Sequence, residues 1–158
     1  MELDLENFIP YRLNRVSVAL SHRTRDVYRT KHQLTVPEWR TLATIGQFSK
    51  ITAKAIGLHS DMHKTKVSRA VSALVDRRWV TKEKNCEDRR EDFLCLTRQG
   101  QHAYEEIIPG LIVFERQLKE TLGSRVASDL LISLRTLEKA LLGTQKSRGD
   151  RRKRASAS

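Results

Sequence analysis

Residues 63–75 combine a helical repeat of apolar residues with a row of positive charge, and this combination constrains the fold more than any other feature of the chain. The apolar members recur at i, i+3, i+4 and i+7, the spacing of one helix face, and they are Val67, Ala70, Val71 and Leu74. The other members of interest are basic or hydroxylated, and they are Lys64, Thr65, Lys66, Ser68 and Arg69. We therefore expect a helix over 62–76 that buries one face and exposes a cationic one.

Two β-prone runs follow this helix. Residues 79–81 and 93–97 are rich in β-branched and aromatic side chains, and the segment 82–92 between them is strongly polar. Because side chains alternate along a strand, Leu94 is expected to face inward and Phe93 outward. Helix, strand, polar turn and strand is the order of elements in a winged helix, and the wing then spans 82–92.

The exposed residues of the predicted helix are of the types that bind duplex DNA. Lysine and arginine neutralise phosphates, arginine also forks onto guanine, and the short hydroxyl groups of serine and threonine fit against base edges. Arg89 and Arg90 occupy the predicted wing tip, where they can reach phosphate or a minor groove. An acid facing DNA would be repelled, so we expect Asp88 to support the wing by holding a nearby arginine. A solvated cationic face is the alternative for the helix alone, and the adjacent wing favours DNA.

Four segments carry a family resemblance, and in chain order they are 34–40, 64–71, 88–90 and 96–100. Together they resemble the MarR-type winged helix-turn-helix regulators, over roughly residues 8–142. The resemblance implies a transcriptional regulator that binds double-stranded DNA. Two positions depart from the usual pattern, because Gly57 stands where such motifs carry alanine and Asp61 stands at a turn position that often carries glycine. Aspartate tolerates a left-handed backbone, so the turn remains compatible.

The composition agrees with a polyanionic partner. The chain of 158 residues has a formal net charge of +11 and a sequence pI of about 10.1, and this balance favours nucleic acid. Part of the excess lies near the C-terminus, because residues 146–154 hold six cations and one anion. We expect residues 146–158 to form a basic disordered tail that attracts DNA without sequence preference.

Several classes of protein are disfavoured. The two cysteines cannot form a disulfide framework and lack metal-site spacing, and the five histidines are scattered, so we expect neither a metal nor a cofactor. We find no glycine-rich phosphate loop, nucleophile elbow or suitably placed carboxylate pair, so an enzyme is not expected. The acidic N-terminus and the lack of a long apolar run indicate neither a secretory signal nor a membrane span, and we expect a cytoplasmic protein.

Helices are expected to flank the winged region. Three apolar stripes predict long helices, over 10–29, 98–121 and 124–142. Thr35 followed by Glu38 predicts a capping box for a further helix, and Thr52 predicts the cap of a short one through Leu58. The expected fold class is therefore mainly α with a small β wing, a winged helix-turn-helix plus long terminal dimerisation helices.

The chain is expected to form one MarR-type domain, residues 1–145, followed by the tail. In this domain a DNA-binding lobe of about 31–97 is flanked by dimerisation helices at 8–30 and 98–142. The terminal helices hold more apolar surface than a small winged domain covers, which favours a homodimer about a two-fold axis; packing within one chain is the alternative. Two recognition helices about one DNA turn apart would match a palindromic operator.

The resemblance also implies control by a small-molecule effector. In this family the ligand pocket lies between the first, second and fifth helices, and regulators similar around 37–40 respond to aromatic acids or their coenzyme A thioesters. The candidate ligand-binding residues are His22, Arg23, Tyr28, Trp39, Arg40 and Phe114. An aromatic wall with arginine suits a planar anion, although Trp39 and Phe114 also fit a plain core. The leading hypothesis is a repressor that its ligand releases from DNA by changing the spacing of the two lobes.

Two alternative functions remain open. Cys86 lies in the wing near Lys84, Arg89 and Arg90, cations that favour a thiolate, and this arrangement is compatible with a redox-sensing repressor or with an incidental thiol. A non-specific nucleic-acid-binding protein would explain the charge and the tail, but not a wing joined to dimerisation helices. An RNA-binding protein is disfavoured because only 6% of the chain is aromatic.

Overall fold

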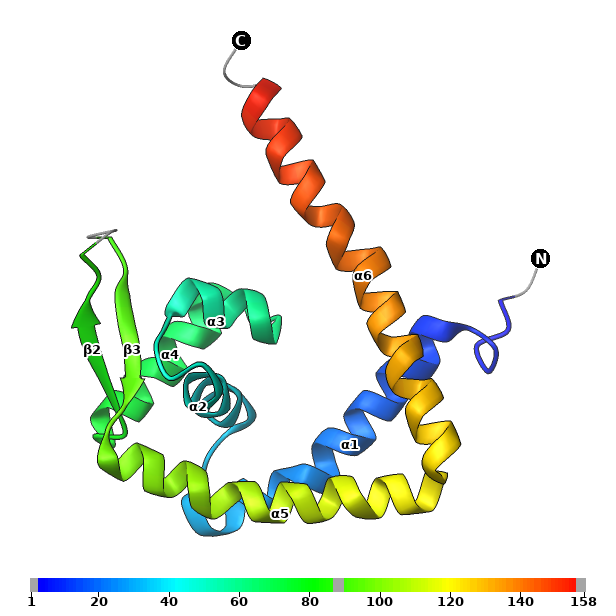
Figure 1. The fold of residues 1–158 in the computed structure, drawn as a ribbon, viewed down its shortest axis with the longest axis horizontal. Helices are drawn as coiled ribbons and strands as arrows, with labels where there is room; N and C mark the ends of the chain where they lie inside the picture. Colours follow the sequence, from blue (N-terminus) through cyan, green and yellow to red (C-terminus); the bar gives the residue numbers. More distant parts are fainter. Residues whose placement is uncertain (1–2, 87–89, 156–158) are drawn as a thin grey trace. The chain divides into compact units, whose positions relative to one another are not determined.

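The computed structural model describes residues 3–86 and 90–155, with side chains described through Leu141. In chain order the elements are α1 (Ile9–His32), α2 (Val36–Phe48), β1 (Ile51–Thr52), α3 (Ala53–Ser60), α4 (Lys64–Asp76), β2 (Val80–Lys84), β3 (Asp92–Leu96), α5 (Arg98–Leu122) and α6 (Ser124–Ala155) (Figure 1). The expected class, mainly helical with a small β wing, is confirmed. The chain divides into two compact units after Ile112, so α5 belongs to both.

The core of the first unit forms where α2, α3 and α4 pack around one another and against the sheet. Leu42 and Ile45 of α2 and Ile56 of α3 are completely buried. The apolar residues predicted for one face of α4 are all buried, and they are Val67, Ala70, Val71 and Leu74. Burial stabilises the fold by roughly 1.5–3 kcal/mol for each large aliphatic side chain. This packing fixes the orientation of α4 and turns its opposite face outward.

A three-stranded antiparallel sheet with the order β1-β3-β2 forms the wing and its base. β2 and β3 pair along their whole length, with Lys84 opposite Asp92 at the far end, and β1 adds Ile51 opposite Leu94. Leu94 is buried and Phe93 only half-buried, as strand alternation predicts. The sequence analysis did not predict β1, because a two-residue strand is defined by its tertiary partner and leaves no pattern of its own.

Side-chain caps set the starts of two helices as the sequence predicted. The Thr35 hydroxyl accepts the N–H of Glu38 (3.4 Å) and the Glu38 carboxylate accepts the N–H of Thr35 (2.8 Å), so the capping box of α2 is confirmed. Thr52 accepts the N–H of Ala55 (3.2 Å) and caps α3. α3 ends at Asp61, whose φ of 51° and ψ of 44° lie in the left-handed region. The turn therefore forms without glycine, as expected for aspartate.

The passage from β3 into α5 is tied to the residues before β2. The N–H of Thr97 donates to the Trp79 carbonyl (3.0 Å), and the Thr97 hydroxyl donates to the Arg78 carbonyl (2.6 Å) and accepts the N–H of Gly100 (3.1 Å). A Cβ at Gly100 would overlap the Trp79 carbonyl oxygen, so only glycine fits there. These contacts attach the start of α5 to the base of the wing.

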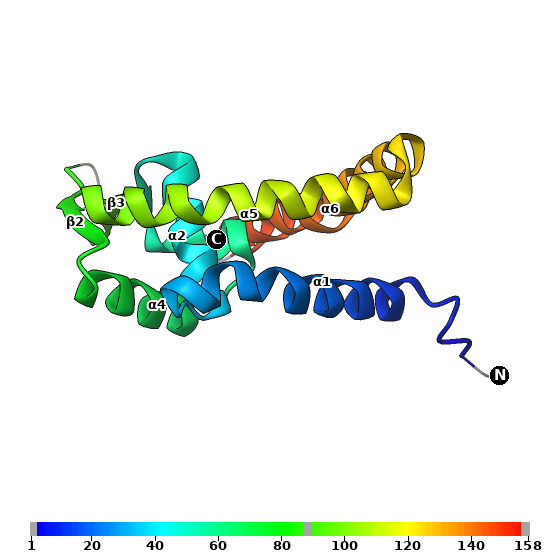
Figure 2. The same ribbon diagram turned by 90° about the horizontal axis from the view of Figure 1, so that it is seen from below.

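The C-terminal part of α1 lies against the first part of α5. Lys31 of α1 donates to Glu106 of α5, and Gly110 lies so close to Val27 that an added Cβ would crowd the valine side chain. In the same unit, α4 and the β2–β3 hairpin lie at the same end (Figure 2). The helix predicted to meet DNA and the wing are thus neighbours.

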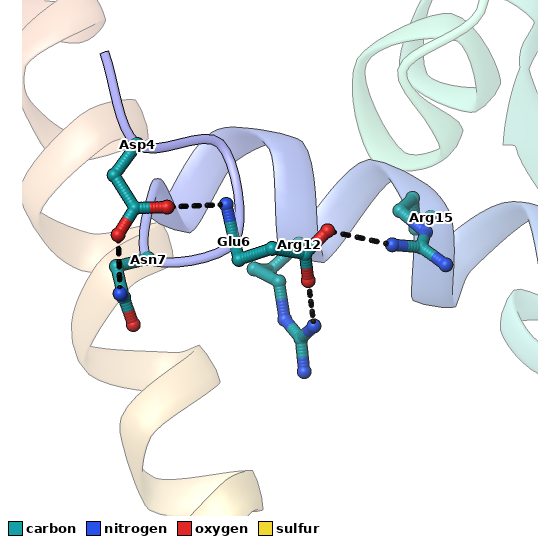
Figure 3. A network of polar contacts seen from close by, with 5 residues as sticks. All are labelled: Asp4, Glu6, Asn7, Arg12 and Arg15. Atoms are coloured by element: carbon teal, nitrogen blue, oxygen red, sulfur yellow. Dashed lines mark hydrogen bonds and ion pairs between the residues drawn. The ribbon is translucent and has the colours of Figure 1, made fainter. Parts of the chain in front are cut away.

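A polar network holds the segment that precedes α1 (Figure 3). The Asp4 carboxylate accepts the backbone N–H of Glu6 (3.0 Å) and the amide of Asn7 (2.6 Å). Glu6 in turn pairs with Arg12 (3.0 Å) and Arg15 (3.3 Å) of α1. All these groups are exposed, so the network orients the segment and adds little to stability.

The second unit contains the end of α5 and α6. An exposed ion pair joins Glu115 and Lys119 (3.0 Å). Among the side chains of this unit that the structure describes, the large exposed apolar ones are Val113, Val126, Leu130, Leu131, Ile132 and Leu141. α6 continues to Ala155, beyond its predicted end at Leu142, so residues 146–155 are helical where the sequence analysis expects disorder. The segment has no proline and is rich in arginine and lysine, which favour helix. Among the described residues no helix is long and apolar enough to cross a bilayer.

Candidate nucleic-acid interface

The exposed face of α4 carries the residues that the sequence predicts to bind DNA. All five are exposed, and they are Lys64, Thr65, Lys66, Ser68 and Arg69. The helix begins at an N-cap formed by His63, whose Nδ1 accepts the N–H of Thr65 (3.3 Å), and its first turn contains no acid. The positive end of the helix dipole therefore adds to the side-chain charge on this face.

The wing presents further positive charge. Lys82 and Lys84 of β2 are exposed, and so is Arg90 in the turn before β3. Asp88 and Arg89, which the sequence analysis assigns to the wing tip, lie outside the described residues. Their predicted roles, support of the wing and contact with DNA, stay predictions.

Two ion pairs link the wing to neighbouring elements. Lys50, just before β1, donates to Glu83 of β2 (2.8 Å) and lies 4.8 Å from the centroid of the Phe93 ring. Lys54 of α3 pairs with Glu91 (3.7 Å). The hydrogen bond from Lys50 lowers the pKa of Glu83, and the same bond raises the pKa of Lys50. Two wing carboxylates therefore hold lysines here, which is the kind of role that the sequence analysis gave to Asp88.

Lys50 and Lys54 are interface cations that the sequence analysis missed. Neither belongs to the amphipathic pattern of α4, and both reach the wing only because β1 pairs with β3. The only local signal is their position on either side of the Ile51–Thr52 strand.

The two cysteines lie in or beside the hairpin. Cys86 is exposed, as a redox role would require, whereas Cys95 is half-buried. Burial, together with the neighbouring Glu83 carboxylate, raises the pKa of Cys95, which disfavours its thiolate. The thiolate fraction of Cys95 is therefore lower than that of a free thiol.

Only part of the predicted ligand-binding set comes together. Tyr28 of α1 stacks on Trp39 of α2 (ring centroids 5.5 Å apart, interplanar angle 13°), and Trp39 stacks on Tyr104 of α5 (6.4 Å, 18°). Tyr28 is 2% exposed, and burial raises its pKa. The stack thus behaves as core. The predicted residues His22, Arg23 and Arg40 are exposed, and Phe114 belongs to the second unit.

A cavity of about 550 Å³ lies where the end of α1 meets the start of α2, and its lining residues are Arg25, Arg29, Gln33, Leu34, Thr35 and Val36. The sequence analysis predicted none of them as ligand-binding residues. The Nε atom of Arg25 is buried and has no hydrogen-bond partner among the described residues. The signal that could have found the site is the pair of arginines at i and i+4 on α1, which lie on one helix face.

Comparison with known proteins finds similarity to one family. The family model described as MarR family matches residues 32–91, from the end of α1 to the wing. Residues 32–91 are therefore similar to the MarR family. A curated relative, the uncharacterized HTH-type transcriptional regulator YwoH of Bacillus subtilis, is 28% identical over 81 residues, which are 51% of this chain and 58% of the relative. The chain thus spans little more than half the length of this relative.

Solved structures share the fold of this chain over most of its length. A MarR/EmrR family regulator from Acinetobacter matches with a TM-score of 0.79 and 24% identity, over 88% of this chain and 98% of that one. A mutant MarR from E. coli complexed with operator DNA matches with a TM-score of 0.73 and 20% identity, over 87% of this chain and 99% of that one. MarR of Staphylococcus aureus in complex with salicylate and kanamycin matches with a TM-score of 0.71 and 19% identity, over 82% of this chain and 87% of that one.

Proposed function

We propose that this protein is a MarR-family DNA-binding transcriptional regulator that acts as a homodimeric repressor on a palindromic operator. The observation that carries the proposal is the outward cationic face of α4, which lies at the same end of the unit as the wing. A helix of this kind fits the major groove while a wing reaches the neighbouring backbone. The E. coli structure with operator DNA, which has the same fold, supports this use of the surface.

Apolar surface on the terminal helices supports the dimer. On α1, Ile9, Val16 and Val18 are about half exposed or more, and α6 carries several exposed leucines as described above. Exposed apolar residues repeated along whole helices are stabilised when a second copy covers them. Two copies would place two α4 helices on one face, which suits an inverted repeat.

The DNA-binding surface can be tested with two arginine variants. We expect Arg69→Ala to weaken binding to a selected operator by about 1–3 kcal/mol and to relax preference at one base position in each half-site, because alanine cannot form a bidentate hydrogen bond with guanine. Arg90→Ala is expected to weaken all sequences alike and to reduce the slope of log affinity against log salt by about one unit for each phosphate that is no longer neutralised. The measurement is fluorescence anisotropy on the selected operator and on random duplex.

Arg116→Ala serves as the matched control, since Arg116 is an exposed arginine of the second unit. Equally weakened binding of Arg69→Ala to operator and random DNA would show that Arg69 does not read a base. Absence of any preferred inverted repeat in a selection from random duplexes would instead indicate the non-specific nucleic-acid-binding alternative.

For the effector, we propose a planar carboxylate, an aromatic acid or its coenzyme A thioester, that binds between α1 and α2 and releases the protein from DNA. Arg25 and Arg29 supply cations to the cavity there, and the unpaired Nε of Arg25 can donate to a carboxylate. The salicylate complex of the S. aureus relative supports this ligand class.

Salicylate should raise the unfolding temperature, and Arg25→Gln should abolish the shift while Arg23→Gln retains it. If Arg23→Gln abolished the shift and Arg25→Gln retained it, the result would favour the exposed residues His22, Arg23 and Arg40 as the ligand-binding set. A raised unfolding temperature with unchanged operator affinity would contradict release from DNA.

A further inference from the structure

A cluster of titratable groups lies where the end of α1, the segment before β2 and the first turns of α5 meet. Its members are Lys31, His32, Arg77, His102 and Glu106, and they surround the Trp79 ring or the Glu106 carboxylate. None of these residues belongs to the DNA-binding face or to the cavity between α1 and α2. The cluster therefore calls for a role of its own.

His32 is the buried member of the cluster. Its side chain is 9% exposed, and its ring meets the Trp79 ring edge-on (centroids 5.8 Å apart, interplanar angle 77°). Its Nε2 lies 3.5 Å from Oε2 of Glu106, which is too long for a strong hydrogen bond. The packing therefore holds the ring in place, and Glu106 gives a positive charge on it only partial support.

Glu106 is shared among three groups, which limits what it can offer His32. Lys31 donates a hydrogen bond to this carboxylate, and Nε2 of the exposed His102 lies 3.7 Å from it. On the other side, the Arg77 guanidinium lies 5.3 Å from the centre of the Trp79 ring and donates to the carbonyls of His32 (2.8 Å) and Gln33. A proton on His32 would add a cation next to Lys31 and Arg77.

The balance of these effects has a clear direction. Burial is the largest influence and lowers the pKa of His32, Glu106 raises it, and Lys31, Arg77 and His102 lower it further. A histidine whose pKa is lower in the folded than in the unfolded state contributes stability above its unfolded pKa of about 6.5. This contribution disappears as the pH falls through the folded pKa.

Trp79 connects this cluster to the wing. Its carbonyl accepts the N–H of Thr97 (3.0 Å), it faces Gly100 at the start of α5, and it directly precedes Val80, the first residue of β2. A change at the His32–Trp79 contact therefore acts at the base of the hairpin. A wing that must be ordered on binding reduces affinity, because ordering costs conformational entropy.

We propose that His32 is a proton-sensitive contact that fixes the base of the wing at neutral pH and releases it under mild acid, which weakens DNA binding. The contact itself stands on the cluster geometry, whereas its effect on DNA binding rests on the proposed function. Acid acts here against the general trend, because protonation of exposed histidines adds positive charge and favours DNA.

Fluorescence of Trp79 tests the contact without DNA. In a Trp39→Phe protein Trp79 is the remaining tryptophan, and an imidazolium against the indole quenches its emission. We expect the emission to titrate with a midpoint below about pH 6.5. The titration should be absent in His32→Gln and unchanged in form in His102→Gln. In Glu106→Gln its midpoint should shift to lower pH, because Glu106 favours the charged ring. Proton NMR titration of the histidine Cε1–H signals in the unmodified protein, assigned with His32→Gln, gives the same midpoint independently.

A midpoint above about 6.5 would overturn the proposal, because the ion pair with Glu106 would then outweigh burial. An identical fluorescence titration in His32→Gln would overturn it as well. The regulatory part is measured as affinity for random duplex at about pH 7.5 and about pH 5.5, and His32→Gln should retain roughly three- to tenfold more of its affinity at the lower pH than the unmodified protein. If the ratio of affinity at about pH 5.5 to affinity at about pH 7.5 were equal in His32→Gln and the unmodified protein, while Trp79 titrated as expected, only the effect on DNA would be overturned. Loss of duplex binding at both pH values would instead count against the proposed function.

Discussion

Gly100 is a residue whose identity is set by a backbone contact. The Trp79 carbonyl lies where a Cβ would stand, and Thr97 holds both segments in this position through three hydrogen bonds. The neighbour is backbone and belongs to the start of the wing, so it cannot move aside as a flexible side chain can. The glycine therefore serves close approach rather than an unusual backbone angle.

We expect Gly100→Ala to destabilise the protein by at least about 2 kcal/mol, because the added methyl group forces the start of α5 away from the wing. Urea unfolding followed by circular dichroism measures the change. Gln99→Ala, at the exposed neighbouring position, should change stability by less than about 0.5 kcal/mol. Equal stability of the Gly100 variant and the control would show that α5 shifts without cost.

For single residues, the sequence predicted those features that follow from local periodicity and local backbone preference. The buried and exposed positions of α4 follow from helix geometry alone, and so does the left-handed Asp61, whose side chain suits that backbone. Lys50, Lys54 and Arg25 were not predicted, because their roles depend on the surroundings that the tertiary fold gives them.

Among the elements, α2 shows most directly how a local sequence signal becomes structure. Its capping box satisfies two backbone N–H groups at the start of the helix, next to the cavity between α1 and α2. We expect Thr35→Ala to cost about 1 kcal/mol, measured by urea unfolding. Glu38→Gln keeps an oxygen for the Thr35 N–H and should cost less. A larger loss for the glutamine variant would mean that the charge of Glu38, and not the cap, stabilises α2.

The wing offers a second test at the scale of elements. Glu83→Gln removes one wing carboxylate and frees Lys50, so affinity for random duplex should rise while stability changes by less than about 1 kcal/mol, as for other exposed pairs. Glu105→Gln removes the same charge from an exposed site on α5 and provides the control for net charge. An equal rise in both variants would indicate that overall charge, and not the release of Lys50, governs the affinity.

Element boundaries were less predictable than element types. The order of helix, strand, turn and strand was predicted, but β2 runs to Lys84 because β3 supplies a partner for each of its residues. α6 passes its predicted end because no proline or cap stops it, and its apolar stripe ends before its helix does. A repeat of apolar residues marks the buried part of a helix. It therefore predicts where the buried part ends and not where the helix ends.

For the whole molecule, self-association is the central expectation. We expect light scattering after size exclusion to give about twice the 18.2 kDa chain mass, and Leu130→Glu to shift the protein toward monomer, because a charge would be buried in the proposed interface. Ser128→Glu adds the same charge on α6 at an exposed polar position and should stay dimeric. A monomer that binds an operator with full affinity would contradict the homodimer.

The overall architecture was more predictable from sequence than the ligand site. Residues 64–71 and 96–100 gave the winged helix in the right order, since each motif reflects a local packing requirement. Of the predicted ligand residues in the first unit, Tyr28 and Trp39 meet in a stack whereas His22 and Arg23 lie exposed on α1, and a sequence pattern cannot show which side chains line a cavity because that depends on helix packing. Tyr28 and Trp39 stack on each other, and Trp39 packs against the buried core.

The two lysines held by wing carboxylates also affect how an association constant should be interpreted. Before any encounter, Lys50 and Lys54 already have anionic neighbours in Glu83 and Glu91, so they carry fewer condensed anions from solution than isolated cations would. Their transfer to a phosphate leaves Glu83 or Glu91 without its lysine, and the freed carboxylate takes up part of the cation that the DNA releases. Counterion release would therefore under-report the phosphates in the footprint, and the number of phosphates seen in a complex structure should exceed the number inferred from salt dependence.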